Sequence, residues 1–274
     1  MKRAILLILM LFSTKVCSFE HFLTVCAIFR DDAPYLKEWI EFHIEQGVEH
    51  FYLYNNMSKD NYSEVLQPFI EKGVLTLTEW PGEHKTEDQW THIQCSSYMD
   101  CVKRIRETSK WCAFIDTDEF LFSPKGKLPY ILKRYEKYGG VCVNWLVYGT
   151  SKVSKIPYGE KIIDYLSLRA SDDYIENLFI KTIAQPRLVT GCNSPHTFLY
   201  VRKKRAVTEN FKNPRGMTSK QNSVHWLRIN HYQTRDEDFF YNVKMPRSKN
   251  WNNKNRKQIE LLNAVYDPIL SSSR

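Results

Sequence analysis

Apolar runs and helical stretches alternate along the first half of the chain. Four runs rich in β-branched and aromatic residues predict β-strands: 21–29, 48–56, 73–80 and 111–116. Three segments between these runs predict helices: 35–47, 62–72 and about 89–108. Strands separated by helices of this length are typical of βαβ units, whose strands form a parallel sheet covered by helices. The pattern therefore predicts an α/β fold.

The first predicted helix illustrates how the pattern assigns a buried face. Four apolar residues share one side of this helix and are expected to pack on the sheet: Leu36, Trp39, Ile40 and Ile44. Either Asp31 or Asp32 stands where an N-cap is expected, and Pro34 falls in the first turn. We therefore expect one of these two carboxylates to cap the helix.

The first 18 residues differ in composition from the rest. Lys2 and Arg3 precede an unbroken apolar run from Ala4 to Phe12. Nine residues of helix cover about 14 Å, less than the hydrocarbon core of about 30 Å. The pattern predicts a signal peptide or short apolar leader at 1–18, with an apolar first element of the fold as the alternative. A leader implies the secretory pathway or cell envelope; without one, we expect a cytoplasmic, membrane-associated protein.

The remaining residues, 19–274, are predicted to form a single domain. No internal repeat or low-complexity segment divides them, and the length suits one α/β domain. The second half is less regular, with Gly, Pro and Asn breaks between isolated strands. We expect it to supply the acceptor-binding side of the same domain.

The composition excludes a disordered chain and favours anionic partners. Aromatic residues make up 14% and charged residues 26% of the 274 residues, and the net charge is +8. The positive excess lies toward the C-terminus, mainly in 201–205 and 244–257. It suits phosphate groups or peripheral contact of this basic region with a membrane, with a solvated basic face as the alternative. No nucleic-acid-binding signature is present, so nucleic acid is not expected as a partner.

The cysteines permit disulfides without requiring them. Six of the seven remain when Cys17 in the leader is set aside, and an even number is typical of secreted domains with disulfides. Three of these six lie in apolar strand-like runs, where buried free thiols are more common: Cys26, Cys112 and Cys142. Because no C-x-x-C pair occurs, a structural zinc site is not expected.

The fourth apolar run ends in a group of carboxylates, WCAFIDTDEF at 111–120. Charge repulsion makes such a group unfavourable unless a cation or a hydrogen-bond network compensates it. In extended backbone Asp116 and Asp118 project to the same side, and their oxygens suit Mg²⁺ or Mn²⁺. Polar residues also follow the first two strands, at 30–32 and 55–60, and ligands bind where parallel strands end. These features predict a cation and phosphate site at this rim, with surface acids or a helix cap as the alternative.

Several stretches together resemble glycosyltransferase family 92 and its relatives, which have the GT-A fold. They occur in the same order across roughly residues 22–250: 26–60, Gln94 with Cys101, 111–120, 144–149, Lys181, His196 and 229–244. The chain departs from the family's Asn-Glu pair, having Asp31 and Asp32 instead. The resemblance implies a GT-A (Rossmann-like) domain with a mixed, mainly parallel sheet flanked by helices. It also implies transfer of a sugar from a nucleotide-sugar to a glycan hydroxyl, with inversion, and a UDP-sugar carrying galactose is the expected donor.

The resemblance also suggests roles for particular residues. A manganese or magnesium ion would be held by Asp116, Asp118 and His231, with His196 as the second candidate for the third ligand. The residues expected to bind the donor are Asp32, Asn55, Asp60, Asp116 and Lys244. Lys244 and Arg247 could neutralise the leaving diphosphate, and the alternative is that both are solvated surface charges.

The transfer reaction needs two further groups that the sequence does not assign. A general base must accept the proton of the acceptor hydroxyl, and four carboxylates are candidates: Glu119, Asp172, Asp173 and Glu176. Aromatic side chains often stack on sugar rings. Trp145 and Tyr148 either do so here or belong to the core.

Two other functions compete with this interpretation. A magnesium-dependent phosphotransferase with Asp116 as nucleophile would also use D-x-D after a strand, but such enzymes normally carry the motif on the first strand. A non-enzymatic basic module that binds nucleic acid or a membrane would explain the charge. Neither accounts for the ordered set of matching stretches.

Overall fold

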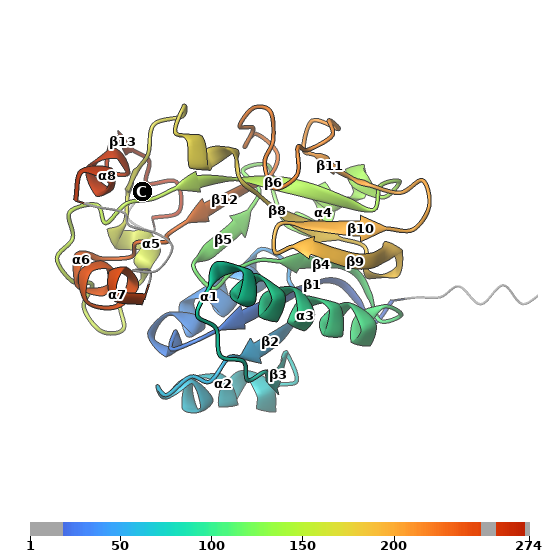
Figure 1. The fold of residues 1–274 in the computed structure, drawn as a ribbon, viewed down its shortest axis with the longest axis horizontal. Coiled ribbons are helices and arrows are strands. Elements are labelled where there is room, and N and C mark those ends of the chain that lie inside the picture. Colours follow the sequence, from blue (N-terminus) through green and yellow to red (C-terminus); the bar gives the residue numbers. More distant parts are fainter. Residues whose placement is uncertain (1–18, 248–255, 272–274) are drawn as a thin grey trace, which may run out of the picture.

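A computed structural model of the chain describes residues 19–247 and 256–271. A nine-stranded sheet runs through its centre in the order β3-β2-β1-β4-β8-β6-β12-β5, and β11 pairs with one end of β6 (Figure 1). Two small two-stranded sheets, β9 with β10 and β7 with β13, lie outside it.

The first half of the chain builds one side of the sheet from parallel strands. Its strands are β1 (His21–Phe29), β2 (His50–Asn55), β3 (Leu75–Glu79) and β4 (Ser109–Phe114). Its helices are α1 (Ala33–Glu45), α2 (Tyr62–Glu71) and α3 (Glu87–Ile105). The four predicted strands and three predicted helices are confirmed.

The second half completes the sheet with shorter strands of both directions. The larger elements are β5 (Glu119–Phe122), α4 (Leu128–Leu132), β6 (Gly140–Val147), β8 (Ile180–Ala184), β11 (Ala206–Thr208) and β12 (Arg228–His231). β6 runs parallel to β11 and β12, whereas β8 is antiparallel to β4 and β6, and β12 is antiparallel to β5. The predicted α/β class with a mixed, mainly parallel sheet is confirmed.

Short elements surround this sheet. They are α5 (Ile162–Tyr165), β7 (Leu168–Arg169), the hairpin of β9 (Val189–Ser194) and β10 (Thr197–Tyr200), α6 (Glu237–Phe239), α7 (Met245–Arg247), α8 (Arg256–Leu261) and β13 (Val265–Tyr266). A π-helical turn, Phe240–Lys244, joins α6 to α7.

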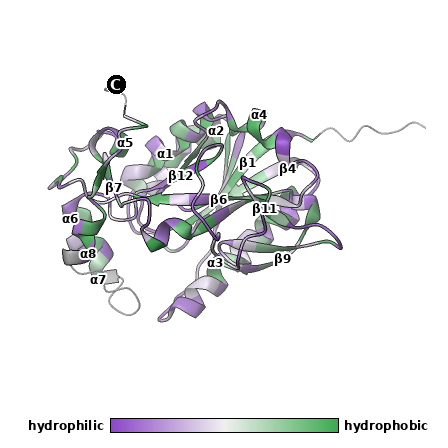
Figure 2. Ribbon diagram, turned by 90° about the horizontal axis from the view of Figure 1, so that it is seen from above, coloured by the Kyte–Doolittle hydropathy of each residue, from purple (hydrophilic) through white to green (hydrophobic). Residues whose placement is uncertain are grey.

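Side chains of β1 alternate between two cores on opposite faces of the sheet. Leu23, Val25, Ala27 and Phe29 belong to the larger core together with α1 and α2. Cys26 and Ile28 belong to a smaller core with α3 and the β9–β10 hairpin. Hydrophobic residues concentrate in interior strands such as β1 and hydrophilic residues in the outer loops (Figure 2). The sheet is therefore covered on both faces, as its nearly continuous apolar strands require.

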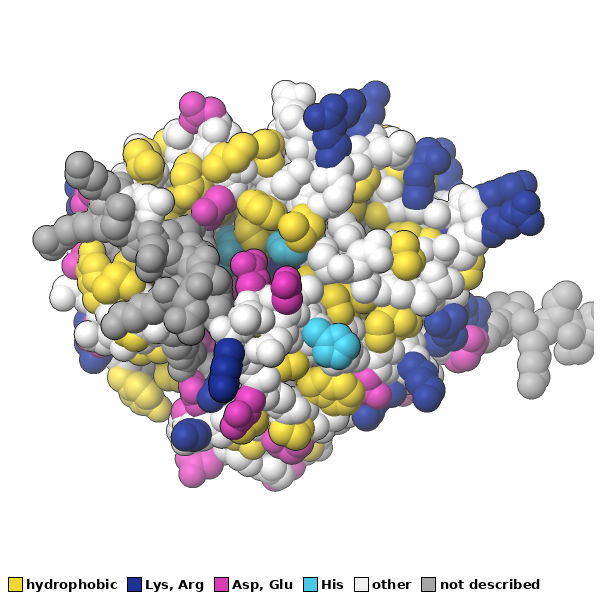
Figure 3. Space-filling model, in the orientation of Figure 1, with side chains coloured by type: hydrophobic (Ala, Val, Ile, Leu, Met, Phe, Trp, Pro, Cys, Tyr) yellow, Lys and Arg dark blue, Asp and Glu magenta, His cyan; other side chains and the backbone are white. Residues whose placement is uncertain are grey.

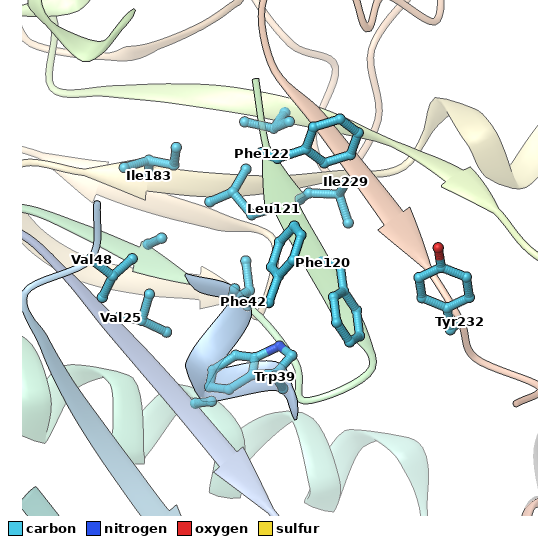
Figure 4. Close-up of a cluster of buried hydrophobic side chains, with 14 of the residues drawn as sticks. Val25, Trp39, Phe42, Val48, Phe120, Leu121, Phe122, Ile183, Ile229 and Tyr232 are labelled. Atoms are coloured by element: carbon cyan, nitrogen blue, oxygen red, sulfur yellow. The ribbon is translucent and has the colours of Figure 1, made fainter. Parts of the chain in front are cut away.

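The helix α1 supplies hydrogen bonds that β5 would otherwise lack. Trp39 Nε1 donates to the carbonyl of Glu119 at 2.8 Å, and the Leu121 N–H donates to His43 Nε2 at 3.1 Å. His43 Nδ1 lies 2.7 Å from the carbonyl of Trp39, so a neutral imidazole with Nδ1 protonated satisfies both partners. Trp39 and Phe42 face β5 in the close-up of the core, with Phe42 against Phe120 (Figure 4). β5 is thus positioned by α1 on one side and β12 on the other.

One part of the predicted buried face of α1 is wrong. Ile44 is 40% exposed, whereas Phe42 and His43 are buried with Leu36, Trp39 and Ile40. The buried face is rotated toward His43 because that side chain hydrogen-bonds to β5, a partner that hydrophobicity alone cannot indicate.

Among the described residues, no helix combines the length and the apolar character needed to cross a bilayer. The predicted leader at 1–18 and most of the basic stretch 244–257 lie outside the described residues. The predicted location and membrane contact therefore stay predictions.

The buried state of His43 predicts that stability depends on pH. Burial lowers the pKa of His43 from its usual 6.5 to about 3. Between these values the unfolded chain binds a proton that the folded protein does not, so stability falls as the pH drops below 6.5. We expect the free energy of unfolding, measured by urea denaturation, to fall by about 1 kcal/mol per pH unit from pH 6 to 5 because of this residue.

The matched variant is His43→Gln, whose amide offers a donor and an acceptor without a titrating group. It should lower stability at pH 7 by about 1–3 kcal/mol and flatten the dependence between pH 6 and 5. An unchanged slope in this variant would contradict the assignment.

Candidate functional site

A cavity of about 490 Å³ lies where β1 and β4 end. Acidic and histidine side chains gather in a hollow near the middle of this face (Figure 3). The cavity is lined by Ile28, Phe29, Arg30, Asp31, Asp32, His84, Trp90, Gln94, Asp116, Thr117, Asp118, Arg235, Phe239 and Lys244. The predicted rim is therefore the wall of a real cavity, and its volume is in the range of small-molecule sites.

The D-x-D segment forms a turn, not an extension of β4. The strand ends at Phe114, and the Glu119 N–H donates to the carbonyl of Asp116 at 3.1 Å. The Glu119 carboxylate accepts the Asp116 N–H at 2.9 Å. The expectation that Asp116 and Asp118 project alike from extended backbone is therefore wrong. They reach the same cavity with different partners.

A buried lysine neutralises the first carboxylate. Lys181, on β8, is 1% exposed, and its Nζ lies 2.8 Å from Asp116 Oδ2 and 3.8 Å from Glu119 Oε1. Gln94 of α3 donates to Asp116 Oδ1 at 2.7 Å. Asp116 is thus fixed from both faces of the sheet.

The charges of this group follow from burial and from one another. Burial would lower the pKa of Lys181, but Asp116 and Glu119 outweigh it and raise the pKa, so the ammonium stays charged. Burial raises the pKa of Glu119 well above its usual range, and the opposing charge of Lys181 offsets only part of this. The cluster therefore holds one cation against Asp116, and burial favours the protonated form of Glu119.

The second carboxylate faces an imidazole and another ammonium group. Asp118 Oδ1 lies 3.4 Å from His231 Nε2, and its Oδ2 lies 3.5 Å from Lys244 Nζ. Burial alone would raise the pKa of Asp118, but the charges of His231, Lys244 and Arg235 outweigh it and hold that pKa well below its usual range. Asp118 is therefore an ionised and largely buried carboxylate.

Asp118 and His231 fit two adjacent positions around one divalent cation. Ligands about 2.1 Å from a metal and at right angles to each other lie about 3 Å apart, close to the 3.4 Å between Asp118 Oδ1 and His231 Nε2. Nε2 is the ring nitrogen of His231 that faces Asp118, whereas Nδ1 is buried and has no hydrogen-bond partner among the described residues.

The described residues form no all-protein metal site with three His, Cys, Asp or Glu side chains. Magnesium typically uses one or two carboxylates and takes its other ligands from water and substrate phosphates. Asp118 and His231 would suffice for that arrangement, while Asp116 is engaged by Lys181. The metal role of these three residues stays a prediction.

Asp32 is available to the cavity because another residue caps α1. The Ala33 N–H donates to Asp60 Oδ2 at 2.8 Å, whereas Asp32, at the N-cap position, makes no capping bond. Asp32 instead accepts from Thr117 Oγ1 at 2.8 Å and from Arg235 Nη2 at 3.1 Å. The expected cap is thus supplied by a separate loop, and Asp32 joins the turn that carries the carboxylates.

Asn55 and Asp60 have structural partners in the loop after β2 and do not line the cavity. Asn55 Nδ2 donates to Glu79 at 2.7 Å, and its Oδ1 accepts the Ser58 N–H at 3.0 Å. These contacts hold the loop against Asp31, whose carboxylate accepts the Lys59 N–H at 2.7 Å. The predicted donor-binding role of Asn55 and Asp60 therefore stays a prediction, and the observed contacts show how they shape the wall.

Arg235 is a cavity residue that the sequence did not single out. It is 2% exposed, and its guanidinium carbon lies 3.6 Å from the centre of the Tyr35 ring and 4.9 Å from that of Phe239. Nη2 binds Asp32, but Nε and Nη1 are buried without a hydrogen-bond partner among the described residues. Unpaired buried donors are costly, so a cavity wall that holds them suits an anionic ligand.

Comparison with known proteins assigns this chain to a family. The model of glycosyltransferase family 92 matches residues 21–269. The chain belongs to glycosyltransferase family 92. The resemblance noted in the sequence is therefore confirmed, and the mixed sheet with its cavity at the strand ends is the predicted GT-A architecture.

Several curated proteins are similar to this family 92 domain. A family 92 protein of Arabidopsis thaliana is 26% identical over 194 residues, covering 65% of this chain and 32% of its own length. The β-1,4-galactosyltransferase galt-1 of Caenorhabditis elegans is 26% identical over 231 residues, covering 78% of this chain and 49% of its own length. The galactan β-1,4-galactosyltransferase GALS2 of A. thaliana is 33% identical over 107 residues, covering 38% of this chain and 20% of its own length. The chain thus spans between a fifth and a half of these relatives.

Among solved structures, residues 1–349 of Staphylococcus aureus TarS in complex with UDP align with a TM-score of 0.44 and 11% identity. The alignment covers 88% of this chain and 68% of that one.

The remaining candidates of the family 92 domain lie around the cavity or away from it. His196 Nδ1 bonds the carbonyl of Ile180 at 2.7 Å, and burial and Lys181 lower its pKa to about 4, so the ring is neutral. Trp145 packs on His231 with ring centres 4.3 Å apart, and Tyr148 is fully buried with its hydroxyl on the Asp267 carbonyl. Both aromatic residues thus belong to the core, and Trp145 also supports His231.

None of the four candidate bases lines the cavity. Glu119 is fully buried, Asp172 is an exposed partner of Arg169, Asp173 accepts from Ser171, and Glu176 accepts from Gln233 at 3.1 Å. The side chain of Arg247 lies outside the described part of the structure.

The contact between Lys181 and Asp116 can be tested through stability. Lys181→Met removes the only charge that compensates Asp116 within 4 Å among the described side chains, and it should lower the free energy of unfolding by about 3–5 kcal/mol. Adding Asp116→Asn should recover part of this loss, since it removes the carboxylate left unpaired. Denaturation of the two single variants and the double variant measures the coupling. Strictly additive losses would contradict the ion pair.

Proposed function

We propose that this domain is a metal-dependent, inverting glycosyltransferase that transfers a sugar from a UDP-sugar to a hydroxyl group of a glycan. The observation that carries the proposal is one cavity, in a family 92 domain, that combines an ionised carboxylate with cationic side chains. Asp118, with His231 beside it, lies close to Lys244 and Arg235. This combination suits a diphosphate accompanied by a divalent cation.

The two sides of the cavity suit different parts of a nucleotide-sugar. Ile28, Phe29 and Trp90 supply apolar surface at the end of β1 and on α3, appropriate for a planar base. Arg235 and Lys244 supply positive charge beside the D-x-D turn. A nucleotide lying across the cavity would therefore place its diphosphate near Asp118.

Transfer of a sugar breaks the bond between the anomeric carbon and the diphosphate. Arg235, whose Nε and Nη1 lack partners among the described residues, and Lys244 would stabilise the charge that the departing diphosphate gains. A divalent cation on Asp118 and His231 would add a Lewis acid at the same oxygens. Lys181 and Gln94 hold Asp116 in place, where it can accept a hydrogen bond from the nucleotide.

The acceptor hydroxyl attacks in a single displacement, so the anomeric configuration inverts and the proton passes to a base. Two curated relatives are named β-1,4-galactosyltransferases, which supports galactose as the transferred sugar and a glycan as the acceptor.

The first test is calorimetric titration of UDP into the protein with and without Mn²⁺. We expect binding in the micromolar range that needs the metal, because Asp118 and His231 leave further coordination positions to the diphosphate. Asp118→Asn should weaken binding at least tenfold, whereas Asp172→Asn, an exposed carboxylate outside the cavity, should bind as the wild type does.

Equal binding by the wild type and Asp118→Asn would contradict the role of the D-x-D turn. If neither UDP nor other nucleotides bind, the phosphotransferase alternative becomes the better one, and its signature is a phosphorylated Asp116.

A second test concerns the guanidinium group of Arg235. Arg235→Lys keeps the charge but removes the planar set of donors, so UDP should bind about 10–100-fold more weakly in the presence of Mn²⁺. Arg202→Lys, in an exposed loop outside the cavity, is the matched control and should have no effect. Thermal unfolding of both variants separates loss of binding from loss of fold. An Arg235→Lys protein that is folded and binds UDP normally would exclude contact between Arg235 and the diphosphate.

A further inference from the structure

Two cysteines from distant parts of the sequence touch near the cavity. Cys95, on α3, and Cys192, on β9, are 97 positions apart, and their Sγ atoms lie 2.9 Å apart. α3 packs directly on β9, so the contact joins a helix on one face of the sheet to the β9–β10 hairpin. The two sulfurs need to approach by less than 1 Å to reach the 2.05 Å of a disulfide bond.

These two thiols differ from the other described cysteines in their access to solvent. Cys95 and Cys192 are partly exposed, whereas the other four are buried: Cys26, Cys101, Cys112 and Cys142. Cys26, Cys101 and Cys112 also lie close together, but all three are fully enclosed in the core. A soluble oxidant can therefore reach the Cys95–Cys192 pair more readily than the four buried thiols.

We propose that Cys95 and Cys192 form a disulfide when the protein is in an oxidising environment. This inference is independent of the proposed function, because it rests on the contact and exposure of the two thiols alone. The pair would remain reduced under the thiol-rich conditions of a cytosol.

The bond forms by two exchanges with a small disulfide such as oxidised glutathione. The Cys95 thiolate attacks one sulfur of the oxidant and releases one glutathione thiolate. The Cys192 thiolate then attacks the mixed disulfide at the Cys95 sulfur and releases the second. The protein loses two electrons and two protons, and the oxidant becomes two molecules of reduced glutathione. The hydrogen bond from Cys192 lowers the pKa of Cys95, which favours Cys95 as the first attacking group.

The cross-link would fix one wall of the cavity. Trp90 and Gln94 precede Cys95 on α3, and both line the cavity, with Gln94 bonded to Asp116. The cross-link would hold this part of the helix against the hairpin. It would also close a long segment of the unfolded chain and so raise the stability of the folded protein.

The test is equilibration of the full chain in buffers that contain different ratios of reduced and oxidised glutathione. Acid quenching, alkylation of free thiols and peptide mapping then identify any linked cysteines. We expect a Cys95–Cys192 linkage under oxidising conditions, with two fewer alkylated thiols than in the reduced protein. The oxidised protein should unfold at a temperature about 10 °C higher.

Variants separate this pair from other pairings. Cys95→Ser and Cys192→Ser should each abolish the rise in unfolding temperature on oxidation, whereas Cys142→Ala, which removes a buried and unlinked thiol, should retain it. Alkylation of both Cys95 and Cys192 at every glutathione ratio would overturn the proposal. Linkage of either residue to Cys17 or Cys101 instead would overturn it equally. If a variant does not fold, peptide mapping of the linked cysteines in the wild-type protein is sufficient to test the proposal.

Discussion

The contact between Lys181 and Asp116 is the interaction on which the rest of the site depends. A strand that ends in three carboxylates is stable only if their charge is compensated, and Lys181 does this from inside the sheet, 2.8 Å from Asp116. Because Lys181 satisfies Asp116, the neighbouring Asp118 is left to face His231 and the cavity. The buried cation thus divides the carboxylates between support and ligand binding. The position of β8 between β4 and β6 carries this lysine to the end of β4.

Around Asp32, too, one carboxylate has a structural role and its neighbour is left to face the cavity. The helix α1 needs an acceptor for its first N–H group, and Asp60 provides it from the loop after β2. Asp32 is then free to bind Thr117 and Arg235, which links the first strand end to the turn after β4 and to the segment after β12. Three loops far apart in sequence are locked by one carboxylate, so the cavity is formed before any ligand arrives. Such preorganisation reduces the entropy that binding would otherwise cost.

The sequence predicted the strands, the helices and the rim because these follow from local periodicity and from polar residues at strand ends. Ile44 was misplaced because the buried face of α1 is set by the hydrogen bond between His43 and Leu121, 78 positions away. The turn at Asp116 was missed because it is closed by Glu119, a residue that looks like part of the next strand. Arg235 was missed because it pairs with Asp32 across 203 positions, and its surroundings become visible only in three dimensions. Asp118 and His231 were placed together through the family resemblance, since no local pattern relates them.

The hydrogen bonds from α1 to β5 have a consequence for how the sheet ends. An edge strand normally presents unpaired N–H and C=O groups to which a strand of another molecule can add. On β5 these groups include the Glu119 carbonyl and the Leu121 N–H, which are already taken by Trp39 and His43. A second chain that approached this edge would find these two backbone groups already paired. The helix therefore acts as a stop to sheet growth, and it protects a strand of wholly buried residues from pairing with a neighbouring molecule.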